Sequence, residues 1–509
     1  MAICATTWQI PRDTHALDAF LSLNKKFGSA GRRAPRKRHG STEGSIRKRG
    51  EATMTRLCPV LASSLVISVL ILNVPVPSQA QIARDPGPRA GSPGAGKPLG
   101  GLTGPQINLF NAGIAEFNKR DEVKADGLGP RMNLDSCAGC HAHPDVGGTS
   151  PPDLNPQFDF YEKNLQKTNR LPRFITKAGP VREARFKLNP DGRTPDGGVH
   201  SIFIITGLKD ADGCVLQQPD FARQLRRKNV IFRIPTPVFG AGLIEQIPDQ
   251  VILDNHATKR GNAYGIRGRV NIINAGHALT ARENRNGNDG TIARFGWKAQ
   301  NKSLLVFAGE AYNVEMGISN ELFQTEREED PKCQFKPTPN DTTKPDQTGL
   351  DVLSDIEKFA AFMRFLAPPT PSQAEPGGAD SISRGKKLFV KTGCALCHAP
   401  SLRTGTSTVA ALSAKEVDLY SDLALHDMGD WLADGISQGQ ATSREFRTAP
   451  LWGLGQRIFF LHDGRTRDLK RAIQEHRSPG SEANRVVRQF FNRLTQSQQQ
   501  DVLNFLRSL

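Results

Sequence analysis

Two copies of one short pattern, Cys-x-x-Cys-His, constrain this 509-residue chain more than any other feature. The first copy is Cys137, Cys140 and His141, and the second is Cys394, Cys397 and His398. At this spacing two thiols can add to the vinyl groups of one haem, and the histidine that follows can reach its iron. A zinc site would need four ligands per metal, and a redox-active cysteine pair would not need the adjacent histidine. The pattern predicts two covalently attached c-type haems with His141 and His398 as iron ligands.

An apolar segment over residues 54–80 has the parts of a secretory signal peptide. Arg56 gives it a positive start, Pro59–Val76 is an uncharged apolar run, and Ser78-Gln79-Ala80 places small residues at a cleavage site. A single transmembrane anchor is the alternative, but the run is short and contains proline. We expect a periplasmic mature chain without a membrane span. Covalent haem attachment also requires an exported apoprotein.

Much of the net charge of +16 lies before this segment. Residues 1–53 hold 11 lysines and arginines against 4 acidic residues. We expect these residues to be a disordered extension, or to precede the true start at Met54. The rest of the chain has only a mild positive excess and no basic stripe interleaved with aromatic residues, so we expect no nucleic-acid partner.

Glycine, proline and hydrophobic spacing predict how the remaining sequence is organised. Residues 81–102 are rich in glycine and proline and predict a flexible leader, and residues 367–380 predict a linker. Apolar residues at helical spacing predict helices over 103–120, 302–316 and 351–366.

Strand signals are short. They fall at 200–206, 229–234 and 250–253, and a terminal helix is expected over 497–508, capped by Ser497. No long alternation of apolar and polar residues occurs. The predicted fold class is therefore mainly α, with loop-rich and short β insertions.

Four of the eight cysteines lie outside the haem motifs. Cys4 and Cys58 belong to the part that is removed with the signal peptide. Cys214 and Cys333 remain, and in an oxidising compartment a disulfide between them is expected. The sequence alone does not place their Cα atoms within bridging distance.

The sixth ligand position of each iron decides what such a protein can do. A strong second ligand favours electron transfer, whereas an open position beside an acid favours peroxide chemistry. The other histidines and methionines of the mature chain are His143, His200, His256, His277, His426, His462, His476, Met132, Met316, Met363 and Met428.

At this point the sequence resembles a known family. The segments that carry the resemblance are Gly127–Pro130, Asn133–Ser136, Arg294–Ala299, Arg233–Glu245, Tyr420–Gly429, Phe446–Trp452, Leu461–Gly464 and Ala472–His476, with the two haem motifs. Over residues 103–509 the chain is similar to the di-haem c-type oxidoreductases and peroxidases, within the bacterial di-haem cytochrome c peroxidase and MauG superfamily. The resemblance implies two cytochrome c-like helical haem domains. We place them at 103–366, with an insertion at about 145–290, and at 381–509.

The resemblance also implies roles. The N-terminal haem would reduce hydrogen peroxide with electrons relayed from the C-terminal haem. Trp297 would lie on the electron path, and Glu315, in an E-M-G segment, would be the distal acid and base. Taken alone, Trp297 could be an ordinary core residue and Glu315 a solvated acid at a helix end.

For the C-terminal haem, the family places its distal ligand about four helical turns after the His-Asp-Gly segment. Counting on from His462 reaches His476, where relatives carry Met or Tyr. Met428 is the alternative, and it could instead pack on the haem face. The family's Thr-x-Pro segment for calcium is replaced by Gln456–Leu461, so the resemblance gives no support for calcium.

Two other functions stay open. His200, His256 or His277 could close the N-terminal haem and leave an electron-transfer cytochrome without peroxidase activity. A MauG-like peroxide-dependent oxidase would use the same oxidant on another substrate. The expected electron donor is a small redox protein or a quinol-derived donor.

Overall fold

The computed structural model of the protein describes residues 82–272, 292–325 and 330–509. The predicted N-terminal extension, the signal peptide and His277 lie outside these residues. Ala80–Leu509 forms one compact unit, and its division into two haem domains stays a prediction. Among the described residues no helix is both long and apolar enough to cross a membrane.

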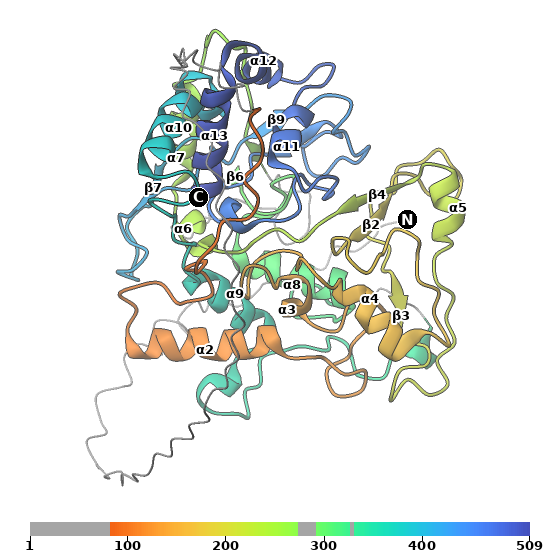
Figure 1. Ribbon diagram of the computed structural model, residues 1–509. Helices are drawn as coiled ribbons and strands as arrows, with labels where there is room; N and C mark the ends of the chain where they lie inside the picture. The colour runs from red at the N-terminus through yellow and green to blue at the C-terminus, as the bar shows by residue number, and fades with distance from the viewer. Residues whose placement is uncertain (1–81, 273–291, 326–329) are drawn as a thin grey trace, which may run out of the picture. The chain divides into compact units, whose positions relative to one another are not determined.

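Helices are the main regular structure of the described residues, with short ribbons of strand and long loops between them (Figure 1). The helices are α2 (Gly104–Asn118), α3 (Cys137–Cys140), α4 (Pro156–Phe160), α5 (Phe221–Arg226), α6 (Ala241–Glu245), α7 (Asp249–Ala257), α8 (Leu304–Met316), α9 (Asp355–Phe365), α10 (Ala379–Lys391), α11 (Leu469–Glu475), α12 (Asn484–Arg493) and α13 (Gln496–Ser508). Single turns of other helix types occur at Tyr161–Leu165, Pro331–Cys333, Gly349–Val352, Cys394–Leu396 and Leu454–Gln456. The helical content agrees with the predicted mainly α class.

The strands pair only two at a time, always antiparallel. The pairs are β1 (Arg131–Met132) with β3 (Phe203–Ile204), β2 (Glu183–Phe186) with β4 (Val230–Arg233), β5 (Asn271–Ile272) with β6 (Ile292–Ala293), β7 (Leu402–Arg403) with β8 (Glu416–Val417), and β9 (Leu425–Asp427) with β10 (Glu445–Arg447). Such ribbons have no core of their own and depend on the helices and loops around them.

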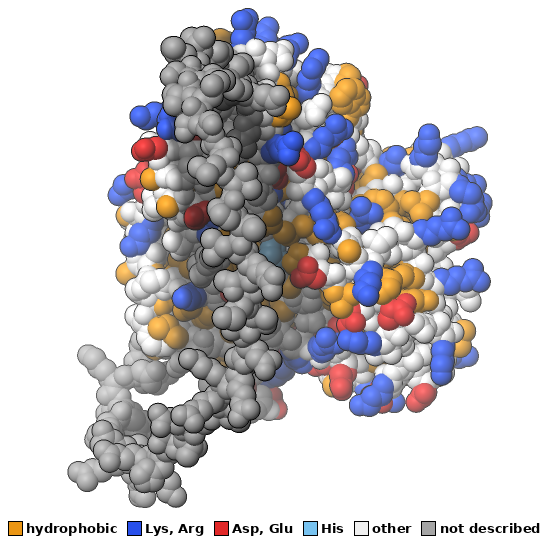
Figure 2. Space-filling model, viewed as in Figure 1, with side chains coloured by type: hydrophobic (Ala, Val, Ile, Leu, Met, Phe, Trp, Pro, Cys, Tyr) orange, Lys and Arg blue, Asp and Glu red, His pale blue; other side chains and the backbone are white. Residues whose placement is uncertain are grey.

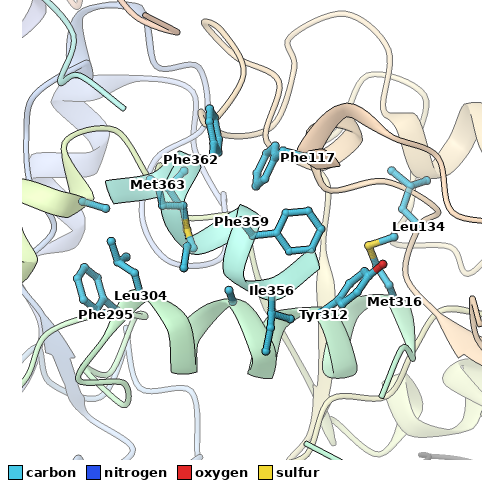
Figure 3. Close-up of a cluster of buried hydrophobic side chains, with 14 of the residues drawn as sticks. Phe117, Leu134, Phe295, Leu304, Tyr312, Met316, Ile356, Phe359, Phe362 and Met363 are labelled. Carbon is cyan, nitrogen blue, oxygen red and sulfur yellow. The ribbon is translucent and has the colours of Figure 1, made fainter. Parts of the chain in front are cut away.

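Helices α2, α8 and α9 pack together in the N-terminal half. Gly113 of α2 allows the closest approach, because a Cβ there would lie 2.4 Å from the carbonyl oxygen of Lys358 in α9. Phe117, Phe359 and Tyr312 meet edge to face beside this contact, with ring centroids 5.1–6.1 Å apart (Figure 3). These three aromatic side chains line the same cavity as the first haem motif.

Helices α10 and α13 lie side by side in the C-terminal half (Figure 1). Gly385 serves the same purpose as Gly113, because a Cβ there would lie 2.0 Å from the carbonyl oxygen of Asp501. Phe389, Tyr420 and Phe505 pack with centroid distances of 5.4–6.1 Å. This cluster supports the second haem motif.

Two local predictions were wrong. Residues 250–253, expected as a strand, lie inside α7, where Pro248 precedes the first turn and Asp249 stands in it. The last helix starts one residue earlier than expected, with Thr495 rather than Ser497 as its cap. The predicted disulfide is present, since Cys214 and Cys333 are bonded with their Cα atoms 4.8 Å apart.

The segment expected to be a flexible leader is instead bound along its length. Asp85 forms a buried ion pair with Arg507 of α13, with an Oδ2–Nη2 distance of 2.7 Å. Further along, the amide of Leu99 donates to the carbonyl oxygen of Phe365, and the amide of Ala367 donates to that of Lys97. Glycine and proline content did not reveal these contacts because their partners lie hundreds of residues away.

The Asp85–Arg507 pair yields a stability prediction. Burial by itself raises the pKa of Asp85, but Arg507 outweighs it and holds that pKa below its usual value. Asp85→Asn would leave a buried guanidinium without its carboxylate, and we expect a loss of about 3–5 kcal/mol in the free energy of unfolding. Chemical denaturation at neutral pH measures this loss.

Exposed Asp212 gives the matched control, since Asp212→Asn should change the free energy by less than about 0.5 kcal/mol. A carboxyl with a lowered folded-state pKa stabilises above its ordinary pKa of about 3.9. The difference in free energy of unfolding between wild type and Asp85→Asn should therefore shrink as the pH falls below about 3.9 towards the lower pKa of the folded state. An equal loss in both variants would contradict the prediction.

Two candidate haem sites

The first site is a cavity around α3. His141 directly follows this helix, and its Nδ1 lies 3.0 Å from the carbonyl oxygen of Gly148. A carbonyl oxygen can only accept a hydrogen bond, so Nδ1 carries the proton and Nε2 is free to bind a metal. Burial lowers the pKa of His141 to about 4, which keeps the ring neutral at pH 7, as a metal ligand requires.

Glu315 lines the same cavity as His141, together with Cys137 and Cys140. The family resemblance thus pointed to an acid that lies in the same cavity as the first haem motif. Other polar lining residues were missed, among them Glu183 and Arg185. The apolar part of the wall includes Phe117, Leu134, Phe307, Tyr312, Met316, Phe359 and Met363, several of which appear in Figure 3.

Gly317 explains why Glu315 stands in a Glu-Met-Gly segment. It ends α8 in the left-handed conformation, with φ +75°. A Cβ at this position would lie 2.6 Å from the carbonyl oxygens of both Gly129 and Arg131. Only glycine allows α8 to end against the backbone of residues 129–131. This contact fixes the final turn of α8, which carries Glu315.

Asn133 orients the carboxyl group of Glu315. Its Oδ1 accepts from the amide of Ile202 at 2.9 Å, so its Nδ2 donates to Oε2 of Glu315 at 2.7 Å. The backbone amide of Asn133 also donates to the carbonyl oxygen of Glu315 at 2.7 Å. Glu315 is therefore held by side chain and backbone alike.

The charge state of Glu315 depends on Glu183. Burial raises the pKa of Glu315 well above its usual value, and the charge and hydrogen bond of Glu183 raise it further. The pKa of Glu183 is lowered, because Arg185 and Arg233 outweigh the effect of its burial. The two opposite shifts favour the protonated form of Glu315 and the ionised form of Glu183.

Neither described histidine of the three that the sequence left open as iron ligands of this site lines its cavity. His200 stacks on Phe186 and bonds to Asp196 through Nε2 at 2.8 Å, and neither it nor His256 lines the cavity. His277 lies outside the described residues. Of the histidines that the structure describes, His141 alone lines this cavity, although the thioethers of Met316 and Met363 also do.

The second site is a cavity around Cys394, Cys397 and His398. Here Nδ1 of His398 lies 3.0 Å from the carbonyl oxygen of Tyr420, which again leaves Nε2 free. Burial lowers the pKa of His398 to about 4. The backbone amide of Asp422 donates to the carbonyl oxygen of Cys397, so the start of the Tyr420–Gly429 segment is joined to the haem motif at two points.

Both predicted sixth ligands, His476 and Met428, line this second cavity. Nδ1 of His476 bonds to the carbonyl oxygen of Ala472 at 2.8 Å, which frees Nε2, and burial lowers the pKa of its ring. Met428 packs in an apolar cluster with Trp297 and Phe446. The choice between imidazole and thioether stays a prediction.

Two further histidines line the cavity. His426 donates from Nδ1 to Glu482 and from Nε2 to Asp422, each at 2.9 Å, so it has no free nitrogen for a metal. His462 stacks on Phe446 at 4.4 Å between ring centroids. Its backbone carbonyl oxygen accepts from the amide of Ile234.

Trp297 joins the two cavities. Its side chain is 9% exposed and lines both of them, as well as a smaller cavity between them. The indole Nε1 donates to the carbonyl oxygen of Ile234 at 2.9 Å, which fixes the plane of the ring. The tryptophan that the sequence pattern selected is thus shared by both sites.

The residues around both cavities fit haem. Each cavity has a pair of thiols at the required spacing, a neutral histidine with a free Nε2 and mostly apolar walls. In the first cavity the Nε atoms of Arg182 and Arg233 are buried without a hydrogen-bond partner among the described residues.

A family model for "di-haem oxidoreductase, putative peroxidase" matches residues 191–509. The chain belongs to this family. The match covers the second haem motif, Trp297 and Glu315, and the first haem motif lies before it. No curated protein matches.

Among solved structures, one similar chain is hydrazine synthase from Kuenenia stuttgartiensis, studied under xenon pressure. It is 14% identical, with a TM-score of 0.32 over 88% of this chain and 100% of that chain.

No group of three or more His, Cys, Asp or Glu side chains in the described part of this di-haem oxidoreductase could hold a free metal ion.

The free Nε2 of His476 leads to a prediction about the second haem. We expect His476→Ala to remove the low-spin electron paramagnetic resonance signal of the C-terminal haem, because an axial ligand is lost. The matched control is His426→Gln, which alters a histidine of the same cavity whose nitrogens are both engaged, and which should keep the signal. If instead Met428→Leu removes the signal and His476→Ala keeps it, Met428 is the ligand.

Proposed function

We propose that this di-haem oxidoreductase is a periplasmic c-type enzyme that reduces hydrogen peroxide in the N-terminal cavity. Its electrons would enter at the C-terminal site from a small redox protein or a quinol-derived donor. The observation that carries the proposal is the half-buried acid Glu315 in the same cavity as His141, with Glu183 beside it.

Six residues would hold the two haems covalently and through their irons. They are Cys137, Cys140 and His141 at one site and Cys394, Cys397 and His398 at the other. Haem iron, when bound, supplies the redox chemistry for cleaving the bond between the two peroxide oxygens.

The acids of the first cavity supply the protons. Reduction of one hydrogen peroxide to two waters consumes two electrons and two protons. Glu183, the ionised member of the pair, can accept the proton that peroxide releases, and protonated Glu315 can donate to the departing oxygen. After one such exchange the pair again holds a single proton, and solvent restores the net uptake.

Trp297 connects the two sites. Its ring is an aromatic system shared by both cavities, and its hydrogen bond to Ile234 keeps it in one orientation. The carbonyl oxygen of Ile234 accepts this bond while its amide donates to His462, so the relay residue is tied to the C-terminal site through the backbone.

One observation favours a second function. Met316 and Met363 line the N-terminal cavity, and a thioether is a strong haem ligand. If either bound the iron permanently, the protein would be a di-haem electron-transfer cytochrome without peroxidase activity.

Glu315→Gln tests the role of the acid. The amide cannot carry the exchangeable proton, so we expect kcat for peroxide reduction to fall by about 10²–10⁴-fold at neutral pH. Stopped-flow turnover of the holoenzyme with a reduced donor measures this. Glu310 provides the control, because it is a half-buried acid of the same helix, bonded to Asn301, that does not line the cavity.

Glu310→Gln should keep kcat within a few-fold of wild type. Equal rates for Glu315→Gln and wild type would rule out Glu315 as the acid and base. Equal losses in both variants would indicate a structural effect of α8 rather than a catalytic one.

Electron paramagnetic resonance separates the two candidate functions. For an enzyme we expect a high-spin ferric signal in the oxidised or the one-electron-reduced holoprotein, and we expect cyanide to abolish it. Two low-spin signals in the oxidised protein, and a single low-spin signal after reduction by one electron, would leave no open position and would establish the electron-transfer cytochrome instead.

A further inference from the structure

Two buried arginines stand where the cavities meet. Arg447 ends β10 and Arg457 follows the turn Leu454–Gln456, and each is 8% exposed. Both line the C-terminal cavity, and both line the small cavity that Trp297 shares with it. The guanidinium carbon of Arg457 lies 5.9 Å from the centroid of the Trp297 ring.

Their hydrogen bonds go to backbone carbonyl oxygens. Arg447 donates from Nε to Gly296 at 2.9 Å and from Nη1 to Thr448 at 3.2 Å. Arg457 donates from Nε to Phe459 at 3.1 Å, and its Nη2 is buried without a hydrogen-bond partner among the described residues. No described carboxylate lies within 4.0 Å of either guanidinium, although Asp422 lies near enough to act on Arg447.

Two neighbouring cations in this setting are costly. Burial lowers the pKa of each arginine to about 10, and Arg457 contributes to the effect on Arg447. Buried charges in proteins are ordinarily paired, and an unpaired one costs several kcal/mol. The geometry therefore leaves a place for an anion between the two guanidinium groups and the cavity.

We infer that Arg447 and Arg457 bind the propionate carboxylates of the haem attached through Cys394 and Cys397. A planar guanidinium matches a carboxylate through two parallel hydrogen bonds, and haem is the group that fits this cavity. The binding would hold the acidic edge of the haem beside Trp297. It would also favour the reduced haem, because positive charge stabilises the added electron.

This inference rests on haem filling the cavity and not on peroxide being the substrate. A small diffusible anion has the same charge and could occupy the same place, so the test must report on the propionates themselves. If the holoprotein contains no haem, the proposed function fails as well. If it contains two haems but reduces no peroxide, the proposed function fails, and the two measurements below still decide whether the arginines bind the propionates.

The first measurement is the midpoint potential of each haem in Arg457→Gln by spectroelectrochemistry. We expect the ferric form of the C-terminal haem to be favoured at least about tenfold over wild type, which is about 59 mV for one electron. The N-terminal haem of the same molecule should shift less. The control is Arg89→Gln, because Arg89 is 9% exposed, has an unpartnered Nε and lines neither cavity.

The second measurement is the propionate-bending region of the resonance Raman spectrum in Arg457→Lys, which keeps the charge but not the planar fork. We expect these bands of the C-terminal haem to move, and to stay in place in Arg89→Lys. Unchanged bands in Arg457→Lys and Arg447→Lys overturn the inference, even if the potential shifts, and would assign the site to a diffusible anion. The lysine variants decide the question alone if Arg457→Gln fails to retain two haems.

Discussion

Each haem-motif histidine has a hydrogen bond from Nδ1 to a backbone carbonyl oxygen, and the function of both sites depends on that bond. Gly148 accepts it from His141 and Tyr420 accepts it from His398, at 3.0 Å in both cases. The bond selects the tautomer, and burial keeps the ring neutral. Without both conditions the nitrogen needed for a metal would be protonated or turned away, and the acids and arginines nearby would have nothing to act upon.

From these equivalent beginnings the two sites differ in their polar groups. The N-terminal cavity sets two acids, Glu183 and Glu315, among the arginines Arg182, Arg185 and Arg233. The C-terminal cavity has four histidines, two arginines and one acid, Glu482, in largely apolar walls. On the visible face the basic side chains are spread without forming one stripe (Figure 2). The paired acids of the first site fit the proton transfers that we propose there, and the second site has no such pair of acids.

The sequence itself revealed the haem motifs, which are contiguous, and the cysteine pair that the count left to be bridged. Glu315 was selected only through the resemblance to the family, because its own spacing would have fitted an ordinary acid at a helix end. Sequence reasoning failed where a partner is distant. Glu183 meets Glu315 only because β2 and the end of α8 come together, and nothing in the spacing of Arg447 and Arg457 indicates that both reach one cavity.

The same limit explains the N-terminal segment. Residues 82–102 looked unstructured because their composition is that of a linker, yet Asp85 pairs with Arg507 across 422 positions of the chain. The side chain of Arg507 is carried by α13, so this ion pair can form only when α13 is in place. The position of the N-terminal segment therefore depends on the packing of α13 against α10, far from it in the sequence.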